Sequence, residues 1–193
     1  MKKIMTFTLA LALAAGISIA SVAAQAADCS SPQKYVESLS NEVVSVIQGS
    51  GTDAAKEAQL TNVFKRIVDT NWMGKFVLGR NWKGLTTEQQ STYLAKYSEY
   101  LVASYVPTFR KYSGEKINIV SSQNLEKEGE FSVSTTIDRP GKESVAVNYR
   151  VRKDAACYKV SDIVAEGISL INTQRQDFGA VFARKGYDGL IES

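Results

Sequence analysis

The stretch that decides the fold is YKVSDIVAEGISLINTQRQDFGAVF, residues 158–182. Its first half, up to Glu166, is rich in β-branched residues and predicts a strand. Gly167 then marks a turn, and the apolar positions of the second half recur at the spacing of one buried helix face. Ser169 is placed to cap this helix and Gly186 to end it. The stretch therefore predicts a strand that turns directly into a long helix, against which the rest of the chain packs.

The N-terminus has the pattern of an export signal. Lys2 and Lys3 precede an apolar segment over residues 4–22, and an A-x-A cleavage signature ends at Ala26. We therefore expect residues 1–26 to be a secretory signal peptide. A retained membrane anchor is the competing interpretation, because the apolar segment is nearly long enough to span a bilayer. The alanine-rich composition and the A-x-A end favour the signal peptide.

The mature chain, residues 27–193, is expected to form a single domain. The sequence is 44% hydrophobic and 22% charged, which argues against a disordered or fibrous protein. Without the two lysines of the signal peptide it has 21 basic and 20 acidic residues, and this balance argues against nucleic acid as a partner. The absence of histidine excludes histidine-based catalysis and the common zinc sites that contain histidine. We expect no catalytic residue, no metal and no cofactor.

The sequence contains two cysteines, Cys29 and Cys157. In an exported protein an even number of cysteines favours a disulfide, because exported thiols meet an oxidising compartment. The bridge would tie the mature N-terminus to the chain just before the central strand. A loop of this length contributes about 4–5 kcal/mol on the chain-entropy model. Two unpaired thiols, one of them on a frayed N-terminus, are the alternative.

The first half of the mature chain has the pattern of helices and the second half has that of strands. Capping residues and helical periodicity predict helices from Ser31-Pro32 to Gly49 and over residues 53–70, 71–79 and 87–111, the last opened by a capping box at Thr86. Alternating apolar residues predict strands over residues 116–121, 131–137, 145–151 and 158–165. Short loops between them indicate an antiparallel meander of four strands, covered on one face by the helices. The expected fold class is α+β.

Asp162 is the strongest candidate for a functional acid. It lies in the middle of the predicted strand, on the face of Val160 and Val164, where an apolar pocket would raise the pKa of its carboxyl group. The alternative is a carboxylate that pairs with a lysine or arginine, or that caps a nearby backbone turn. We favour this alternative, because no second acid, base or oxyanion group accompanies Asp162.

Four segments resemble the periplasmic MlaC/toluene-tolerance family. They are residues 72–82 with a Leu-Gly-x-x-Trp element, residues 105–114, residues 158–178 with the pattern D…EGISL…R…F, and residues 186–191. The resemblance spans essentially the whole mature chain, and its most specific part is the strand–helix junction.

Members of this family are soluble phospholipid carriers. They shuttle glycerophospholipids between an outer-membrane complex and an inner-membrane ABC transporter in Gram-negative bacteria. The resemblance implies a periplasmic protein without enzymatic activity, with phospholipid as its ligand. It implies as partners an inner-membrane ABC transporter complex and an outer-membrane lipoprotein/porin complex, and as its role the maintenance of outer-membrane lipid asymmetry. The implied fold is a curved antiparallel sheet with N-terminal and C-terminal helices that enclose a deep apolar cavity for the acyl chains.

The inward faces of the strands and helices are expected to line this cavity. The predicted lipid-binding residues are Phe76, Leu78, Tyr105, Val133, Val147, Tyr149, Val164, Ile168 and Leu170. Arg110 and Arg175 are expected to contact a headgroup or a docking partner, with a solvated helix face as the alternative. Two other functions stay open from the residues alone. One is a chaperone or binding module for another amphipathic ligand, and the other is a small enzyme built around Asp162.

Overall fold

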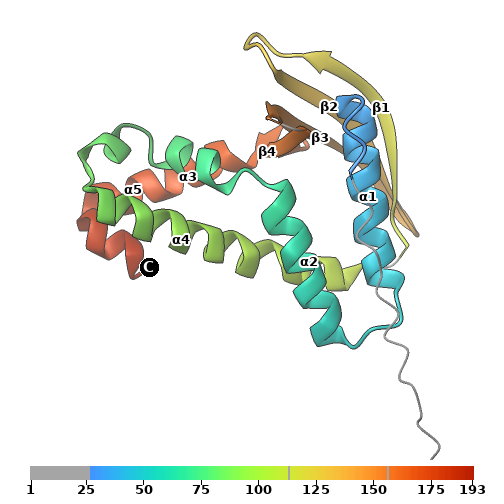
Figure 1. Ribbon diagram of the computed structural model, residues 1–193, viewed down its shortest axis with the longest axis horizontal. Helices are drawn as coiled ribbons and strands as arrows, with labels where there is room; N and C mark the ends of the chain where they lie inside the picture. Colours follow the sequence, from blue (N-terminus) through green and yellow to red (C-terminus); the bar gives the residue numbers. More distant parts are fainter. Residues whose placement is uncertain (1–26, 113, 156) are drawn as a thin grey trace, which may run out of the picture.

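The computed structural model of the protein describes residues 27–112, 114–155 and 157–193 (Figure 1). The expected signal peptide, residues 1–26, and the side chain of Arg110 lie outside the described parts. The helices are α1 (Pro32–Gln48), α2 (Asp53–Ile67), α3 (Thr70–Leu78), α4 (Thr87–Tyr105) and α5 (Leu170–Ile191), with short 3₁₀ helices η1 (Gly79–Gly84) and η2 (Val106–Lys111). The strands are β1 (Lys116–Asn124), β2 (Glu130–Arg139), β3 (Lys142–Asp154), β4 (Cys157–Ala165) and β5 (Ile168–Ser169).

The α+β class expected from the sequence is confirmed, with one more strand than predicted. The strands form one antiparallel sheet in the order β1-β2-β3-β4-β5. The fifth strand has two residues, which is too short to show an alternating pattern. The register shifts between Ile119 and Ser121 in β1 and between Arg150 and Val151 in β3. Such irregularities increase the local twist of a sheet, and the sheet in Figure 1 is strongly twisted.

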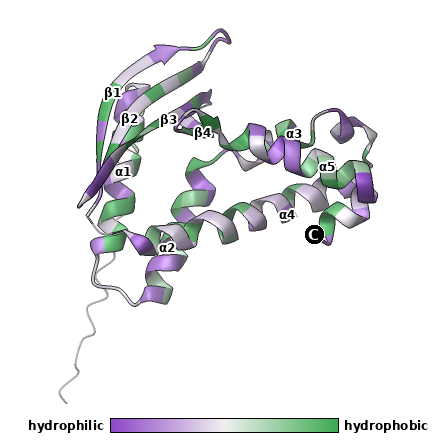
Figure 2. Ribbon diagram, turned by 180° about the vertical axis from the view of Figure 1, so that it is seen from behind, coloured by the Kyte–Doolittle hydropathy of each residue, from purple (hydrophilic) through white to green (hydrophobic). Residues whose placement is uncertain are grey.

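The described residues form three buried apolar clusters, and α2 contributes to each of them. The smallest joins Val46, Leu60 and Val106 of α1, α2 and η2. In a second cluster, α1 lies along the sheet, and Tyr35, Val36 and Leu39 pack against Val133, Val151 and Val160. In the third, α3, α4 and α5 pack on one another and extend away from the sheet (Figure 1). Figure 2 shows hydrophobic segments on α1 and α2 and again along α3 and α5. The sheet therefore buries its apolar face against α1, while α3, α4 and α5 form a core of their own.

The helices begin where the capping residues predict, but two of them end earlier. Thr86 and Gln89 form the predicted capping box at the start of α4. The helix predicted to reach residue 111 ends at Tyr105, because Pro107 lacks the N–H that a helix interior needs, and it continues as η2. The helix predicted to reach residue 70 ends at Ile67, because Val68 is extended and pairs with Val160 of β4. Gly186 interrupts α5 with a φ of 70°, after which the helix resumes.

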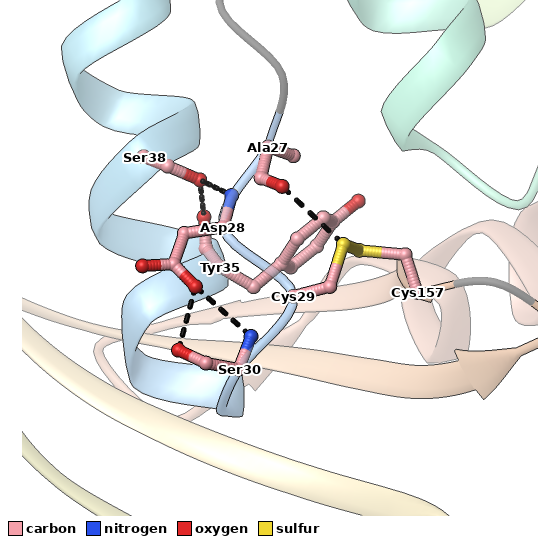
Figure 3. The surroundings of a disulfide bond; sticks show 7 residues. All are labelled: Ala27, Asp28, Cys29, Ser30, Tyr35, Ser38 and Cys157. Carbon is pink, nitrogen blue, oxygen red and sulfur yellow. Dashed lines mark hydrogen bonds between the residues drawn. A yellow bond between two sulfur atoms is a disulfide. The ribbon is translucent and has the colours of Figure 1, made fainter.

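The disulfide favoured from the sequence is present. Cys29 and Cys157 are bonded with an S–S distance of 1.97 Å and a Cα–Cα distance of 5.1 Å (Figure 3). The ring of Tyr35 on α1 lies 5.6 Å from that of Tyr158 on β4, centroid to centroid. The disulfide therefore holds the N-terminal end of α1 against the beginning of β4.

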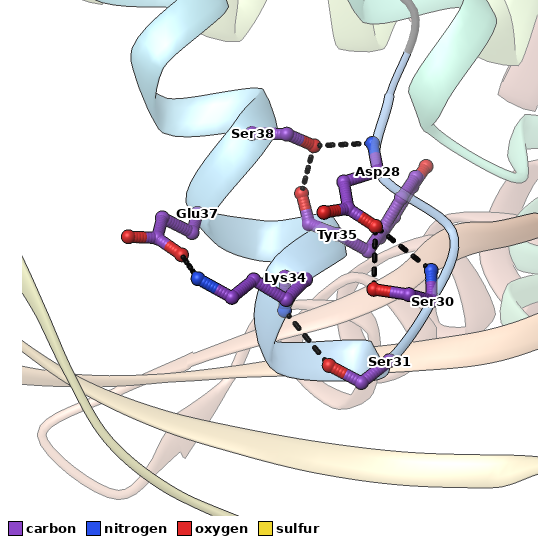
Figure 4. Close-up of polar contacts among 7 residues, drawn as sticks. All are labelled: Asp28, Ser30, Ser31, Lys34, Tyr35, Glu37 and Ser38. Carbon is purple, nitrogen blue, oxygen red and sulfur yellow. Dashed lines mark hydrogen bonds and ion pairs between the residues drawn. The ribbon is translucent and has the colours of Figure 1, made fainter.

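The segment before α1 folds back on that helix (Figure 4). The backbone N–H of Asp28 donates to the Ser38 hydroxyl, and Ser31 caps α1 by accepting from the N–H of Lys34. The hydroxyl and the N–H of Ser30 donate to the Asp28 carboxylate and hold the pKa of this group below its ordinary value. These contacts order the residues that carry Cys29.

Candidate apolar ligand cavity

An apolar cavity of about 390 Å³ lies between α1, α2, η2, the neighbouring residues Tyr112 and Glu115, and the sheet. The helices contribute its largest share of aliphatic side chains. Its lining consists of Val36, Leu39, Ser40, Val43, Val44, Ile47, Phe64, Ile67, Val68, Thr108, Phe109, Lys111, Tyr112, Glu115, Ile117, Ile137, Tyr149, Val160 and Ile163. A concave, mostly apolar space of this size is typical of a site for a small apolar ligand.

The periodicity of the helix and of the strands explains why each presents apolar side chains to the cavity. On α1 the lining positions Val36, Leu39, Val43 and Ile47 are three or four residues apart and share one helix face. On the sheet, Ile117 pairs with Ile137 and Tyr149 pairs with Ile163, so neighbouring strands present apolar side chains side by side. An apolar helix face thus lies opposite an apolar sheet face.

Tyr149 brings a polar group to this wall. Burial raises the pKa of its hydroxyl above the ordinary value, so the side chain stays neutral at any physiological pH. It therefore adds a hydroxyl to the apolar lining without adding a charge.

The structure places one of the nine predicted lining residues, Tyr149, on this cavity. Phe76, Leu78 and Tyr105 lie in or against the core of α3, α4 and α5. Val133 and Val147 are buried in the sheet, Val164 and Leu170 are half-buried, and Ile168 is 68% exposed. Contact of these eight residues with a ligand stays a prediction. Sequence reasoning did not single out the rest of the lining, on α1, α2, η2 and the strands, although the helical spacing of Leu39, Val43 and Ile47 was visible.

Asp162 caps the beginning of α5, as the favoured interpretation of this residue held. Its side chain is buried, and its carboxylate accepts hydrogen bonds from the Ser169 hydroxyl at 2.7 Å and from the Ile171 N–H at 3.2 Å. A guanidinium nitrogen of Arg150 lies 3.7 Å away. The carboxylate thereby ties β4 to the N-terminus of α5, where a negative charge is favourable.

We expect Asp162→Ala to lower the free energy of unfolding by about 2–3 kcal/mol. The change leaves the buried Ile171 N–H without its acceptor and removes a helix cap. Chemical denaturation of the variant measures the effect. Asp177→Ala, at an exposed position of the same helix, is the control and is expected to change stability by less than about 0.5 kcal/mol. A loss at Asp162 as small as that of the control would contradict the capping role.

Arg175 packs against the C-terminal end of α3. Its guanidinium donates to the Phe76 carbonyl oxygen at 3.0 Å and lies 4.8 Å from the centre of the Phe76 ring. Gly79, which follows α3, has a φ of 58°, and a Cβ at this position would lie 2.9 Å from Arg175 Nη2. This close packing explains the Leu-Gly element and the arginine together. A contact of Arg175 with a headgroup or a partner stays a prediction.

Within the described parts of the chain, no helix combines the length and the apolar character needed to cross a membrane. The fold and the cavity define a class of α+β proteins in which helices and an antiparallel sheet enclose an apolar space. Residues 37–193 match the model of the family described as MlaC protein, and the chain belongs to this family. The family expected from the sequence is therefore confirmed.

Two relatives are similar over most of their length. The protein of Haemophilus influenzae named intermembrane phospholipid transport system binding protein MlaC is 22% identical over 169 residues, which cover 83% of this chain and 79% of that protein. A solved structure of a phospholipid-binding protein from Ralstonia solanacearum, in complex with a phospholipid, matches with a TM-score of 0.74 and 25% sequence identity. It covers 86% of this chain and 94% of that chain.

Proposed function

We propose that this protein is a periplasmic phospholipid carrier. It binds the acyl chains in the apolar cavity and shuttles glycerophospholipids between an outer-membrane complex and an inner-membrane ABC transporter complex, which maintains outer-membrane lipid asymmetry. The observation that carries the proposal is the apolar cavity between α1 and the sheet in a chain of the MlaC family. The descriptions of both relatives, one a transport-system binding protein and one a phospholipid-binding protein in complex with a phospholipid, support it. Both relatives are described as binding or transport proteins, which supports a role other than catalysis.

The physical reason for a carrier is the insolubility of the chains. Two acyl chains contain about thirty methylene groups, and at about 0.8 kcal/mol each their exposure to water costs on the order of 20 kcal/mol. Escape into water is therefore negligible, and transfer requires a lining that passes the chains to a partner. Movement between two apolar linings is nearly isoenergetic, so direction has to come from the partner complexes.

The volume of the cavity bears on the size of the ligand. A methylene group takes up about as much space as a water molecule in the liquid, about 30 Å³, so two chains need about 900 Å³. The cavity of about 390 Å³ holds roughly one chain. We therefore expect α1 and the sheet to move apart when a diacyl lipid binds.

The same volume favours a second candidate function. A cavity sized for one chain suits a binding module for a single-chain amphipath. This function needs no widening of the cavity, and the mass of the bound ligand distinguishes it from the carrier of diacyl lipids.

Native mass spectrometry with lipid extraction tests both functions on the mature protein, purified from periplasm without detergent. We expect one diacyl glycerophospholipid per protein. A single-chain adduct would favour the second function. An unliganded mass, under conditions that retain lipid on another carrier, would contradict both.

A further inference from the structure

A polar groove of about 900 Å³ lies beside the apolar cavity, between α1 and the edge strand β1. Its lining consists of Gln33, Lys34, Glu37, Ser40, Asn41, Val44, Ser45, Gln48, Tyr112, Glu115, Lys116, Ile117, Asn118 and Ile119. The residues that line both spaces are Ser40, Val44, Tyr112, Glu115 and Ile117. The groove and the cavity therefore adjoin along these five residues, which we call the seam.

Helix α1 separates the two spaces by its own amphipathic pattern. Val36, Leu39 and Val43 face the cavity, while Lys34 and Asn41 face the groove. A ligand that crosses the seam thus passes from an aliphatic wall to a wall of amides and charges. This is the geometry that an amphipathic ligand requires, with its chains on one side of the seam and its polar end on the other.

The formal charges of the residues that line the groove cancel. Lys34 and Lys116 contribute two positive charges, and Glu37 and Glu115 contribute two negative ones. On α1, Lys34 Nζ lies 2.8 Å from a Glu37 carboxylate oxygen, with both side chains about half exposed (Figure 4). At the other wall Lys116 pairs in the sheet with Asp138, which accepts a hydrogen bond from Asn118 at 2.7 Å. The groove therefore offers ammonium and carboxylate groups together, without a net positive field.

From this arrangement we propose that the groove between α1 and β1 is a headgroup site that prefers zwitterionic headgroups, which carry a phosphate and an amine, over headgroups with a net negative charge. The lysines pair with the phosphate and the glutamates pair with the amine. A headgroup with a phosphate alone leaves the glutamates facing a like charge, which opposes its binding. The inference rests on the proposed function, because the headgroup reaches the groove only when the chains occupy the cavity.

Competition between two lipids tests the preference. The mature protein is stripped of lipid, incubated with vesicles of equal phosphatidylethanolamine and phosphatidylglycerol, separated from them, and its bound lipids are quantified. We expect phosphatidylethanolamine in about two- to fivefold excess, the range that a partly exposed charge supports. Glu37→Lys is expected to bring the ratio to one or below. Lys116→Glu is expected to move the ratio in the opposite direction.

The chain offers a matched control on another helix. Lys96 and Glu99 on α4 form an exposed pair with the same spacing of three residues and a distance of 2.9 Å, and neither lines the groove. Glu99→Lys makes the same change of net charge as Glu37→Lys. We expect its ratio of bound phosphatidylethanolamine to phosphatidylglycerol to equal that of the wild type.

Three outcomes would overturn either the headgroup site or the proposed function on which it rests. A bound ratio equal to that of the vesicles, unmoved by either groove variant, overturns the headgroup site and leaves the carrier standing. An equal shift in Glu37→Lys and Glu99→Lys assigns the effect to bulk charge and also overturns the site. Failure of the wild type to take up either lipid contradicts the proposed function itself.

Discussion

Removing the disulfide with the double variant Cys29→Ser/Cys157→Ser is expected to lower the free energy of unfolding by about 4 kcal/mol. The bond joins residues 128 positions apart, and cross-linking so long a loop restricts the unfolded chain strongly. Most small domains are stable by only about 5–15 kcal/mol, so the variant loses a large share of its stability. Equilibrium unfolding in urea, followed by circular dichroism, measures the difference.

Reduction of the wild type gives the control for this prediction. Cys29 is exposed, so a dithiol reductant reaches the bond, and the reduced wild type is expected to match the double variant. The double variant itself is expected to unfold at the same urea concentration with and without reductant. A loss below about 1 kcal/mol in both cases would show that the N-terminal segment adds little to the stability of the fold.

The disulfide also restrains the movement of α1 relative to the sheet. It holds the N-terminal end of α1 to the start of β4, while Gly49 follows the C-terminal end of the same helix. We therefore expect α1 to move away from the sheet mainly near Ile47, where it lines the cavity.

The strand–helix junction was predictable because its signals are local. Gly167 has a φ of 84°, which favours glycine, and Ser169 accepts from the N–H of Asn172 at the start of α5. The alternating strands and the capping box of α4 are local in the same sense. The end of α2 was not predictable, because Val68 leaves the helix to pair with Val160, a residue more than ninety positions away.

The site was predictable in its chemistry but less so in its location. Sequence patterns show which residues share one face of a helix or a strand, yet they do not show which two faces oppose each other. Leu78 has the apolar character of a cavity residue, but the packing of α3 on α5 buries it in a core. Phe76 packs against the same core and lines a different pocket, near Asp162 and Ile171. Leu39 and Val43 on α1 have the same character and line the open space.

Filling the cavity from α1 is expected to abolish most lipid binding. Val43 is half-buried and lines the cavity, so a tryptophan at this position places a large ring where a chain would lie. Inserting bulk into a packed apolar space costs about 1–3 kcal/mol. Because the empty cavity has room for the ring, this cost destabilises the lipid-bound protein and not the free protein. We expect Val43→Trp to lower bound lipid about tenfold or more, measured by lipid extraction and mass spectrometry.

Val181→Trp separates blocked binding from a general loss of structure. Val181 is also half-buried on a helix, but it packs against the core of α3, α4 and α5 and does not line the cavity. Because Val181 already packs against this core, the variant is expected to lose stability and to keep its lipid, while Val43→Trp keeps its stability and loses its lipid. The reverse pattern would place the acyl chains among α3, α4 and α5, where Phe76, Leu78 and Tyr105 lie, and would contradict the cavity between α1 and the sheet.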